Sequence, residues 1–272
     1  GDVFLAKHTT SGERVALKIL NEKTCAEPKR VARFFEIIEK ASALGHPGLI
    51  NIRETVHELD TPSFYTMDAL NGATLSSYRP KSLDVSLEIA CQLGKAMAKA
   101  HENKIVHGQL NMDNVYLLAN SQGKRRVSIL DFGAYELRSE TSDLTVHDDL
   151  KSLGMILETI FAPFENKPTE LSRVIELCLA PDKQEKPKNA DDIAKTLQWI
   201  MQQRPAQKRV EPTPAIVNQE PLLDGDDDDF EVLQWKQKSL ARKRKVVVSL
   251  LGACIAVAAI AYGTQMRWDE AI

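Results

Sequence analysis

The stretch "HGQLNMDN", residues 107 to 114, leads into two β-rich runs, "NVYLL" and "RVSIL", and the second run is followed by "DFG" at 131 to 133. A polar loop separates the two runs, which predicts a β-hairpin. Asn114 begins this hairpin and Asp131 follows it, and both side chains carry oxygen atoms. Asp131 precedes Phe132 and Gly133, where it can be a turn residue.

Three further β-rich runs lie upstream of this hairpin and are bounded by turn residues. They are "RVALKIL" (14–20), "LINIRETVHEL" (49–59) and "SFYTMDAL" (63–70), and a helical stretch at 32–44 separates the first two. The pattern predicts a small sheet that carries one helix. Lys18 lies inside the first run, where its apolar neighbours hold it in a strand.

Helical periodicity replaces the strand pattern after Ser82. The apolar positions recur at i, i+4 and i+7 spacing, and Ser82 or Asp84 can cap this helix. These positions are Leu83, Leu87, Ala90, Gly94 and Met97. A later amphipathic helix, "DDIAKTLQWIM", directs Ile193, Leu197 and Ile200 inward. Strands followed by helices predict an α+β, two-lobed fold over residues 1 to 200, with a small β-rich N-lobe and a helical C-lobe.

The composition excludes several classes of protein. The chain has 272 residues, 43% apolar content and a net charge of -3, so it can bury a substantial core and has no field of one sign that suggests nucleic-acid binding. The four cysteines lie far apart without a C-x-x-C pair, which argues against a disulfide framework or a zinc site. We expect them to be packing residues.

A long apolar segment stands near the C-terminus. Residues 246 to 263 carry no charge, and as a helix they cover roughly 27 Å of a hydrocarbon core about 30 Å thick. We predict one transmembrane helix here, with a buried core helix as the alternative. The basic cluster at 242 to 245 places the N-terminal part in the cytoplasm and residues 264 to 272 outside. We expect no signal peptide in this stretch, and we expect the chain to be a fragment of a longer protein at both ends.

Residues 201 to 245 have the composition of a linker, rich in proline and aspartate and ending in the basic juxtamembrane cluster. The aspartate run "DGDDDDFE" lacks the ligand spacing of a calcium loop, so a solvated acidic linker is the better interpretation. In the apolar segment, the spacing Gly252-x-x-x-Ala256 lets helices approach closely and raises the possibility of a homodimer.

The order of motifs over residues 1 to 200 resembles the eukaryotic-like (Hanks-type) Ser/Thr protein kinases, in particular their bacterial membrane-anchored members. "VALK" at 15 to 18 is similar to the strand with the phosphate-binding lysine, and "MDALNGATL" from Met67 to the hinge. "HGQLNMDN" resembles the catalytic loop and "DFG" the magnesium motif. "DLKSLG" from Asp149 resembles the aspartate-started helix that anchors the catalytic loop.

The resemblance implies ATP and Mg²⁺ as cofactors and assigns residues to them. Lys18 is expected to bind phosphate, and Asn114 and Asp131 are expected to bind the metal through the hard oxygen donors that Mg²⁺ prefers. The spacing of Asp131 from Asn114 favours this role over that of a turn residue. Gln109 and Asn111 stand at the catalytic positions. The full set expected to line the nucleotide site is Gly1, Val3, Ala16, Lys18, Met67, Asp68, Ala69, Leu70 and Tyr116.

The departures from the family pattern concern the catalytic chemistry. Gln109 replaces the aspartate that accepts the substrate proton, and an amide cannot take up a proton at neutral pH. Losing such a base typically costs about 10² to 10⁴ in rate. Asn111 stands where the family has a lysine, and Gly108 replaces the arginine that pairs with a phosphorylated activation segment. The segment between "DFG" and Asp149 is short and lacks A-P-E.

Two departures concern the nucleotide site. An ungapped family register places Ile37 where the helix glutamate should hold Lys18, with Glu36 one residue early. An apolar Ile37 would then face the cleft, unless a one-residue bulge restores Glu36. Tyr116 stands where a smaller apolar residue usually forms the floor of the adenine pocket.

Three functions follow as hypotheses. The first is a cytoplasmic, membrane-tethered pseudokinase that binds Mg-ATP weakly or not at all and scaffolds or relays a signal through protein partners. The second is an active Ser/Thr kinase that uses Gln109 to position the substrate hydroxyl. The third is a tail-anchored adaptor that acts by self-association.

Overall fold

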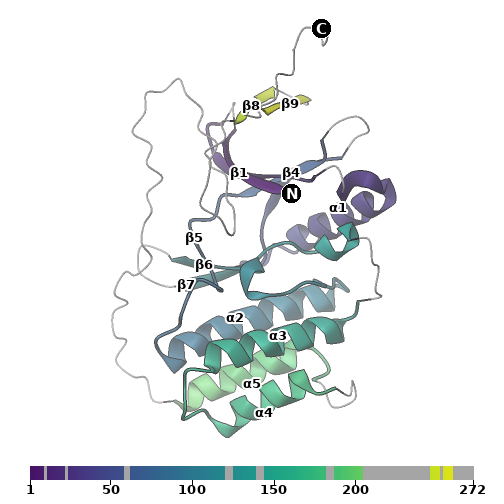
Figure 1. Ribbon diagram of the computed structural model, residues 1–272. Helices are drawn as coiled ribbons and strands as arrows, with labels where there is room; N and C mark the ends of the chain where they lie inside the picture. Colours follow the sequence, from purple (N-terminus) through teal and green to yellow (C-terminus); the bar gives the residue numbers. More distant parts are fainter. Residues whose placement is uncertain are drawn as a thin grey trace.

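The computed structural model describes residues 1–8, 11–21, 24–57, 62–119, 125–138, 144–181 and 187–204, and the backbone of 246–251 and 254–259. Within the first 204 residues, the N-terminal strands form one lobe and most of the helices form the other (Figure 1). The predicted α+β architecture, with the sheet first and the helices afterwards, is therefore confirmed.

The N-lobe is a four-stranded antiparallel sheet in the order β1-β2-β4-β3. Helix α1 packs against it through Phe34 and Phe35, whose rings contact Tyr65 of the sheet. The register places Lys18 directly opposite Tyr65 on the neighbouring strand. The elements are β1 (Asp2–Lys7), β2 (Arg14–Ile19), α1 (Pro28–Ala43), β3 (Ile52–Val56) and β4 (Phe64–Asp68), with a 3-10 turn η1 (Thr24–Ala26) before α1.

The C-lobe contains four long helices: α2 (Leu83–Glu102), α3 (Val146–Phe161), α4 (Thr169–Leu179) and α5 (Ala190–Gln203). Ser82 caps α2, because its side chain accepts a hydrogen bond from the backbone N–H of Val85 at 3.2 Å. Helix α2 packs closely on α5 at Gly94, where an added Cβ would lie 3.0 Å from the Cβ of Ala194. Ile193, Leu197 and Ile200 are buried as predicted.

A second sheet of three strands lies between the lobes, in the order β5-β6-β7. Strands β6 (Val115–Ala119) and β7 (Arg125–Ile129) form the predicted hairpin, and β5 (Gly72–Thr74) pairs with β6. The short turns η2 (Met112–Asn114) and η3 (Ala134–Leu137) flank this hairpin on either side. The hairpin therefore carries Asn114 at its entry and Asp131 just beyond its exit.

The C-terminal apolar segment differs from the prediction of one helix. Val246–Leu251 and Cys254–Ala259 are the antiparallel strands β8 and β9, with pairs from Val246↔Ala259 to Leu251↔Cys254. The valine run at the start favours strand because β-branched residues fit an extended backbone. No helix among the described residues is long and apolar enough to cross a membrane. The linker after residue 204, the basic cluster, Gly252 and residues 264 to 272 lie outside the described residues.

Candidate active site

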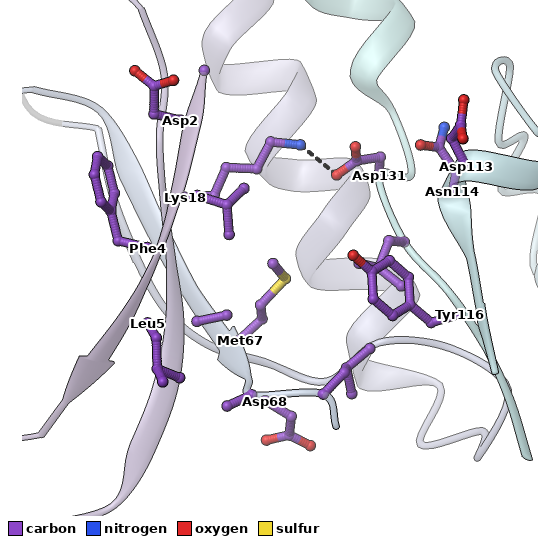
Figure 2. A pocket seen from close by; sticks show the side chains of 16 residues that line it. Asp2, Phe4, Leu5, Lys18, Met67, Asp68, Asp113, Asn114, Tyr116 and Asp131 are labelled. Carbon is purple, nitrogen blue, oxygen red and sulfur yellow. Dashed lines mark hydrogen bonds and ion pairs between the residues drawn. The ribbon is translucent and has the colours of Figure 1, made fainter. Parts of the chain in front are cut away.

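A cavity of about 390 Å³ opens between the N-lobe sheet and the β6–β7 hairpin (Figure 2). All nine residues predicted to bind the nucleotide line it, and so do Asn114 and Asp131. Gln109 and Asn111 lie outside this set. The lining residues that the prediction missed are Asp2, Phe4, Leu5, Asp113 and Leu130.

Lys18 and Asp131, which both line this cavity, form an ion pair. The Nζ of Lys18 lies 2.5 Å from Oδ1 of Asp131, and the two side chains are only 16% and 25% exposed. Burial alone would lower the pKa of Lys18, but Tyr65 and Asp131 raise it above its ordinary value. Burial would raise the pKa of Asp131, yet Lys18 holds it below the usual range. Both groups are therefore charged at neutral pH.

Helix α1 supplies no carboxylate to this pair. Glu36 lies on the surface, where its carboxylate is 2.5 Å from the Nζ of Lys40. Ile37 faces inward instead, and a Cβ added to Gly133 would lie 2.8 Å from its Cγ2. The ungapped register predicted this arrangement, with no bulge to restore Glu36. Lys18 is therefore paired with Asp131, just beyond the hairpin, rather than with a residue of α1.

The backbone of Asp131 is strained. Its φ is 63°, in the left-handed region that non-glycine residues rarely adopt, while the following Gly133 adopts φ 70° without penalty. Such a conformation costs on the order of 1 to 3 kcal/mol and persists where side-chain contacts determine it. Phe132 is buried between them, with its ring centroid 4.5 Å from that of His107.

Asp149 anchors the loop at 107 to 114 from below. Its buried carboxylate accepts hydrogen bonds from the backbone N–H groups of His107 at 2.7 Å and Gly108 at 2.8 Å, and it lies 3.0 Å from Nε2 of His101. Helix α3, which carries Asp149, begins at Val146 with Thr145 as its cap. The prediction that Asp149 starts the helix was therefore wrong by three residues, because Thr145 and Asp148 form a capping box.

Two asparagines order the rest of this loop. Asn111 caps η2 by accepting the backbone N–H groups of Asp113 and Asn114 at 2.8 and 3.1 Å. The amide nitrogens of Asn111 and Asn114 both donate to the carbonyl oxygen of Gln109, at 3.1 and 3.0 Å. Since its nitrogen is engaged by Gln109, Asn114 presents its amide oxygen as the remaining acceptor.

The donor set fits a magnesium ion that is shared with a phosphate. Asn114 and Asp131 offer amide and carboxylate oxygens, the hard ligands that Mg²⁺ takes. Among the described residues no group of three His, Cys, Asp or Glu side chains is placed to hold a metal on its own. Further ligands would have to come from a bound substrate or from water, as is usual for Mg²⁺ at phosphate sites.

Comparison with known proteins decides the family. The family described as "Protein kinase domain" matches residues 1–153. This chain belongs to the protein kinase domain family. The kinase domain of Mycobacterium tuberculosis PknI shares its fold, with a TM-score of 0.57 and 21% identity over 72% of this chain and 90% of that domain.

Bacterial Ser/Thr protein kinases are among its relatives in sequence. Serine/threonine-protein kinase Pkn1 of Myxococcus xanthus is 30% identical over 139 residues, which is 50% of this chain and 20% of that protein. Probable serine/threonine-protein kinase PknB of Lactococcus lactis is 32% identical over 183 residues, 57% of this chain and 28% of that protein. The chain thus spans between a fifth and a third of the length of these relatives.

The side chain of Gln109, which the motif order predicts to stand at the position of the catalytic base, faces an arginine. With its amide oxygen turned toward Arg138, Gln109 accepts hydrogen bonds from Nε at 2.5 Å and from Nη2 at 3.3 Å. The carbonyl oxygen of Arg138 in turn accepts a hydrogen bond from Arg30 of α1. Nothing in the local sequence signals this contact, because Arg138 is an exposed residue 29 positions further along the chain.

Gly108, at the position of the kinase loop arginine, is covered by Tyr135. The φ of Gly108 is 74°, and any Cβ there would clash with the ring of Tyr135 and lie 2.9 Å from Cδ1 of Leu144. A larger side chain and Tyr135 in this position therefore exclude each other. The start of the activation segment is docked here by packing rather than by a charged pair, in agreement with the loss of the arginine.

The buried His107 makes stability depend on pH. Its Nε2 donates to the carbonyl oxygen of Leu130 at 2.8 Å, and burial lowers its pKa, so it is neutral in the folded state. The unfolded state, with a histidine pKa near 6.5, binds the proton first as the pH falls. Stability is therefore present above about pH 6.5 and is lost below it.

We expect the free energy of unfolding to fall by about 1 to 2 kcal/mol more between pH 7 and pH 5 in the wild type than in His107→Gln. Urea denaturation at pH 5, 6 and 7 measures this difference. Parallel losses in the two proteins would contradict a neutral buried His107.

Proposed function

We propose that this chain is a membrane-tethered protein kinase domain that acts mainly as a pseudokinase, scaffolding or relaying a signal, with weak Mg-ATP binding. The observation that carries this proposal is Gln109 at the base position, with its amide engaged by Arg138. An amide cannot accept the substrate proton at neutral pH, and a neighbouring guanidinium cannot accept it either.

The second catalytic position supports the same conclusion. Asn111 stands where the family has a lysine that neutralises the transferring phosphoryl group, and its side chain is committed to the cap of η2 and to Gln109. It offers no positive charge. The loss of a general base costs about 10² to 10⁴ in rate, and the missing cation adds to this deficit.

The cleft itself still supports nucleotide binding. Lys18 is the single basic side chain among the lining residues, which also include four aspartates: Asp2, Asp68, Asp113 and Asp131. A triphosphate in such a site needs divalent cations to offset its charge. Mg²⁺ held by Asn114 and Asp131 would supply that neutralisation, while Lys18 binds phosphate and the hinge from Met67 to Leu70 borders the base. Binding is expected to be weak because Lys18 must also leave Asp131.

An active Ser/Thr kinase is the competing function, and one observation favours it. Asp131, Asn114 and Lys18 line one cavity, so the parts that hold the triphosphate in place are present. A phosphotransfer assay of the intact protein with labelled ATP, with Asp131→Ala as the control, separates the two functions. Incorporation of label that depends on Asp131 would defeat the pseudokinase proposal.

Nucleotide binding is tested by thermal stability. Mg-ATP at ten times its Kd stabilises the native state by about 1.4 kcal/mol, which raises Tm by roughly 3 to 5 °C for a domain of this size. We expect Lys18→Met to abolish this rise and Lys151→Met, on the exposed face of α3, to preserve it. A wild type whose Tm stays constant at millimolar Mg-ATP would contradict nucleotide binding.

We also propose that residues 246 to 263 tether the domain to a membrane, with the kinase domain cytoplasmic. The uncharged run and the preceding basic cluster support this. The intact chain should stay in the membrane pellet at alkaline pH, and Val257→Asp should release it. A soluble wild type would refute the tether.

A further inference from the structure

Tyr65 lies behind the ion pair of Lys18 and Asp131 without lining the cavity. The side chain is almost completely buried, with 1% of the residue exposed. Its hydroxyl donates to Oδ1 of Asp131 at 3.3 Å, and the Nζ of Lys18 lies 5.9 Å from the centre of its ring. Oδ1 of Asp131 therefore accepts hydrogen bonds from both Lys18 and Tyr65.

The ring of Tyr65 is fixed from its other side by helix α1. Its centroid lies 5.8 Å from that of Phe34 and 6.4 Å from that of Phe35, and the second pair meets edge to face at 87°. Glu36, on the same helix, faces the solvent. Helix α1, which has no carboxylate there, is thus connected to the ion pair through the rings of Phe34 and Phe35 and the hydroxyl of Tyr65.

We propose that Tyr65 is a positioning residue for Asp131, the proposed metal ligand. Tyr65 connects α1 to the cleft in place of a helix carboxylate, and its hydroxyl holds the carboxylate of Asp131 against Lys18. Two consequences follow. Without the hydroxyl, the carboxylate of Asp131, whose backbone is strained, loses its hydrogen bond to Tyr65 and keeps the one to Lys18. The hydroxyl also competes with Mg²⁺ for the Asp131 carboxylate, so it sets the concentration of metal that the site needs.

The first consequence is tested by hydrogen exchange in the free protein. The amides of Leu130, Ala134 and Glu136 make backbone hydrogen bonds around Asp131 and report on its segment. We expect Tyr65→Phe to speed exchange over residues 130 to 136 about tenfold and to leave the β6–β7 hairpin unchanged. The matched control is Tyr78→Phe, which removes a hydroxyl from a tyrosine that stacks on Arg125 outside the cavity. Unchanged exchange at 130 to 136, or equally faster exchange throughout β2 and β4, would overturn the proposal.

The second consequence rests on the proposed nucleotide binding. At a fixed ATP concentration, we expect the Mg²⁺ concentration that gives half of the thermal stabilisation to be about five- to tenfold lower in Tyr65→Phe than in the wild type or Tyr78→Phe. A residue that serves only packing would lower Tm without moving this midpoint, and that result would overturn the proposal. If ATP stabilises none of the three proteins at any Mg²⁺ concentration, nucleotide binding fails, and the exchange experiment still decides the role of Tyr65.

Discussion

Restoring the missing base is expected to raise the rate of phosphoryl transfer by at least about a hundredfold. The variant Gln109→Asp with Arg138→Ala places a carboxylate at the base position and removes the guanidinium that would pair with it. The expected gain is the lower end of the range of about 10² to 10⁴ for general-base catalysis, because Asn111 still lacks the positive charge of the family lysine. Initial rates with labelled ATP and a Ser/Thr-containing protein substrate measure it.

Two variants isolate the cause of this gain. Arg138→Ala alone should leave the rate within about twofold of the wild type, since it supplies no base. Adding Asp131→Ala to the restored variant should abolish transfer, because the proposed metal ligand is lost. A restored variant that stays at the level of the wild type would show that the missing base does not limit this kinase domain.

The second large effect concerns stability. Asp149→Asn is expected to lower the free energy of unfolding by about 3 kcal/mol. The two carboxylate oxygens of Asp149 accept hydrogen bonds from the backbone N–H groups of His107 and Gly108, and in asparagine an NH₂ group, which cannot accept, replaces one of these oxygens. The substitution keeps the size of the side chain, so the loss reports on hydrogen bonding rather than on a cavity. Urea denaturation with an unchanged m-value measures it.

An exposed aspartate provides the control for this measurement. Asp191 pairs with Lys195 at 2.6 Å, but its side chain is 38% exposed, so Asp191→Asn should cost less than about 1 kcal/mol. Equal losses in the two variants would mean that Asp149 does not anchor the catalytic loop. The same Asp149→Asn variant should also increase the mobility of Gln109, because Gln109 directly follows His107 and Gly108, whose N–H groups Asp149 binds.

Local sequence patterns predicted the main elements because each pattern is set by residues within one element. β-rich runs bounded by turn residues identified strands β2, β3, β4, β6 and β7, and the i, i+4 and i+7 spacing after Ser82 identified α2. The motif register predicted that Lys18 and Asp131 share one cleft and that Ile37 faces it, and the structure places Ile37 against Gly133. The positions of these three residues follow from the order of the motifs along the chain and from the β6–β7 hairpin, and both can be recognised in the sequence.

The contacts that the sequence did not reveal join residues far apart in the chain. Tyr65 reads as a core aromatic in an apolar strand, and its bond to Asp131 spans 66 positions. Arg138 and Tyr135 contact Gln109 and Gly108, which lie 29 and 27 positions earlier in the chain. The C-terminal run has an apolar composition that suits either a helix or a strand, and its valines favour the strand that the structure has.

Tyr116, which lines the cleft, is a feature that a selective inhibitor of this domain could recognise. Tyr116 points toward the cavity from β6, and burial raises the pKa of Tyr116 to about 12, so its phenol stays protonated at any physiological pH (Figure 2). A heterocycle shaped to the cavity beside this ring would leave a gap in a relative with a small apolar residue there. A chemical probe built on that difference would distinguish this cleft from those of kinases in the same cell.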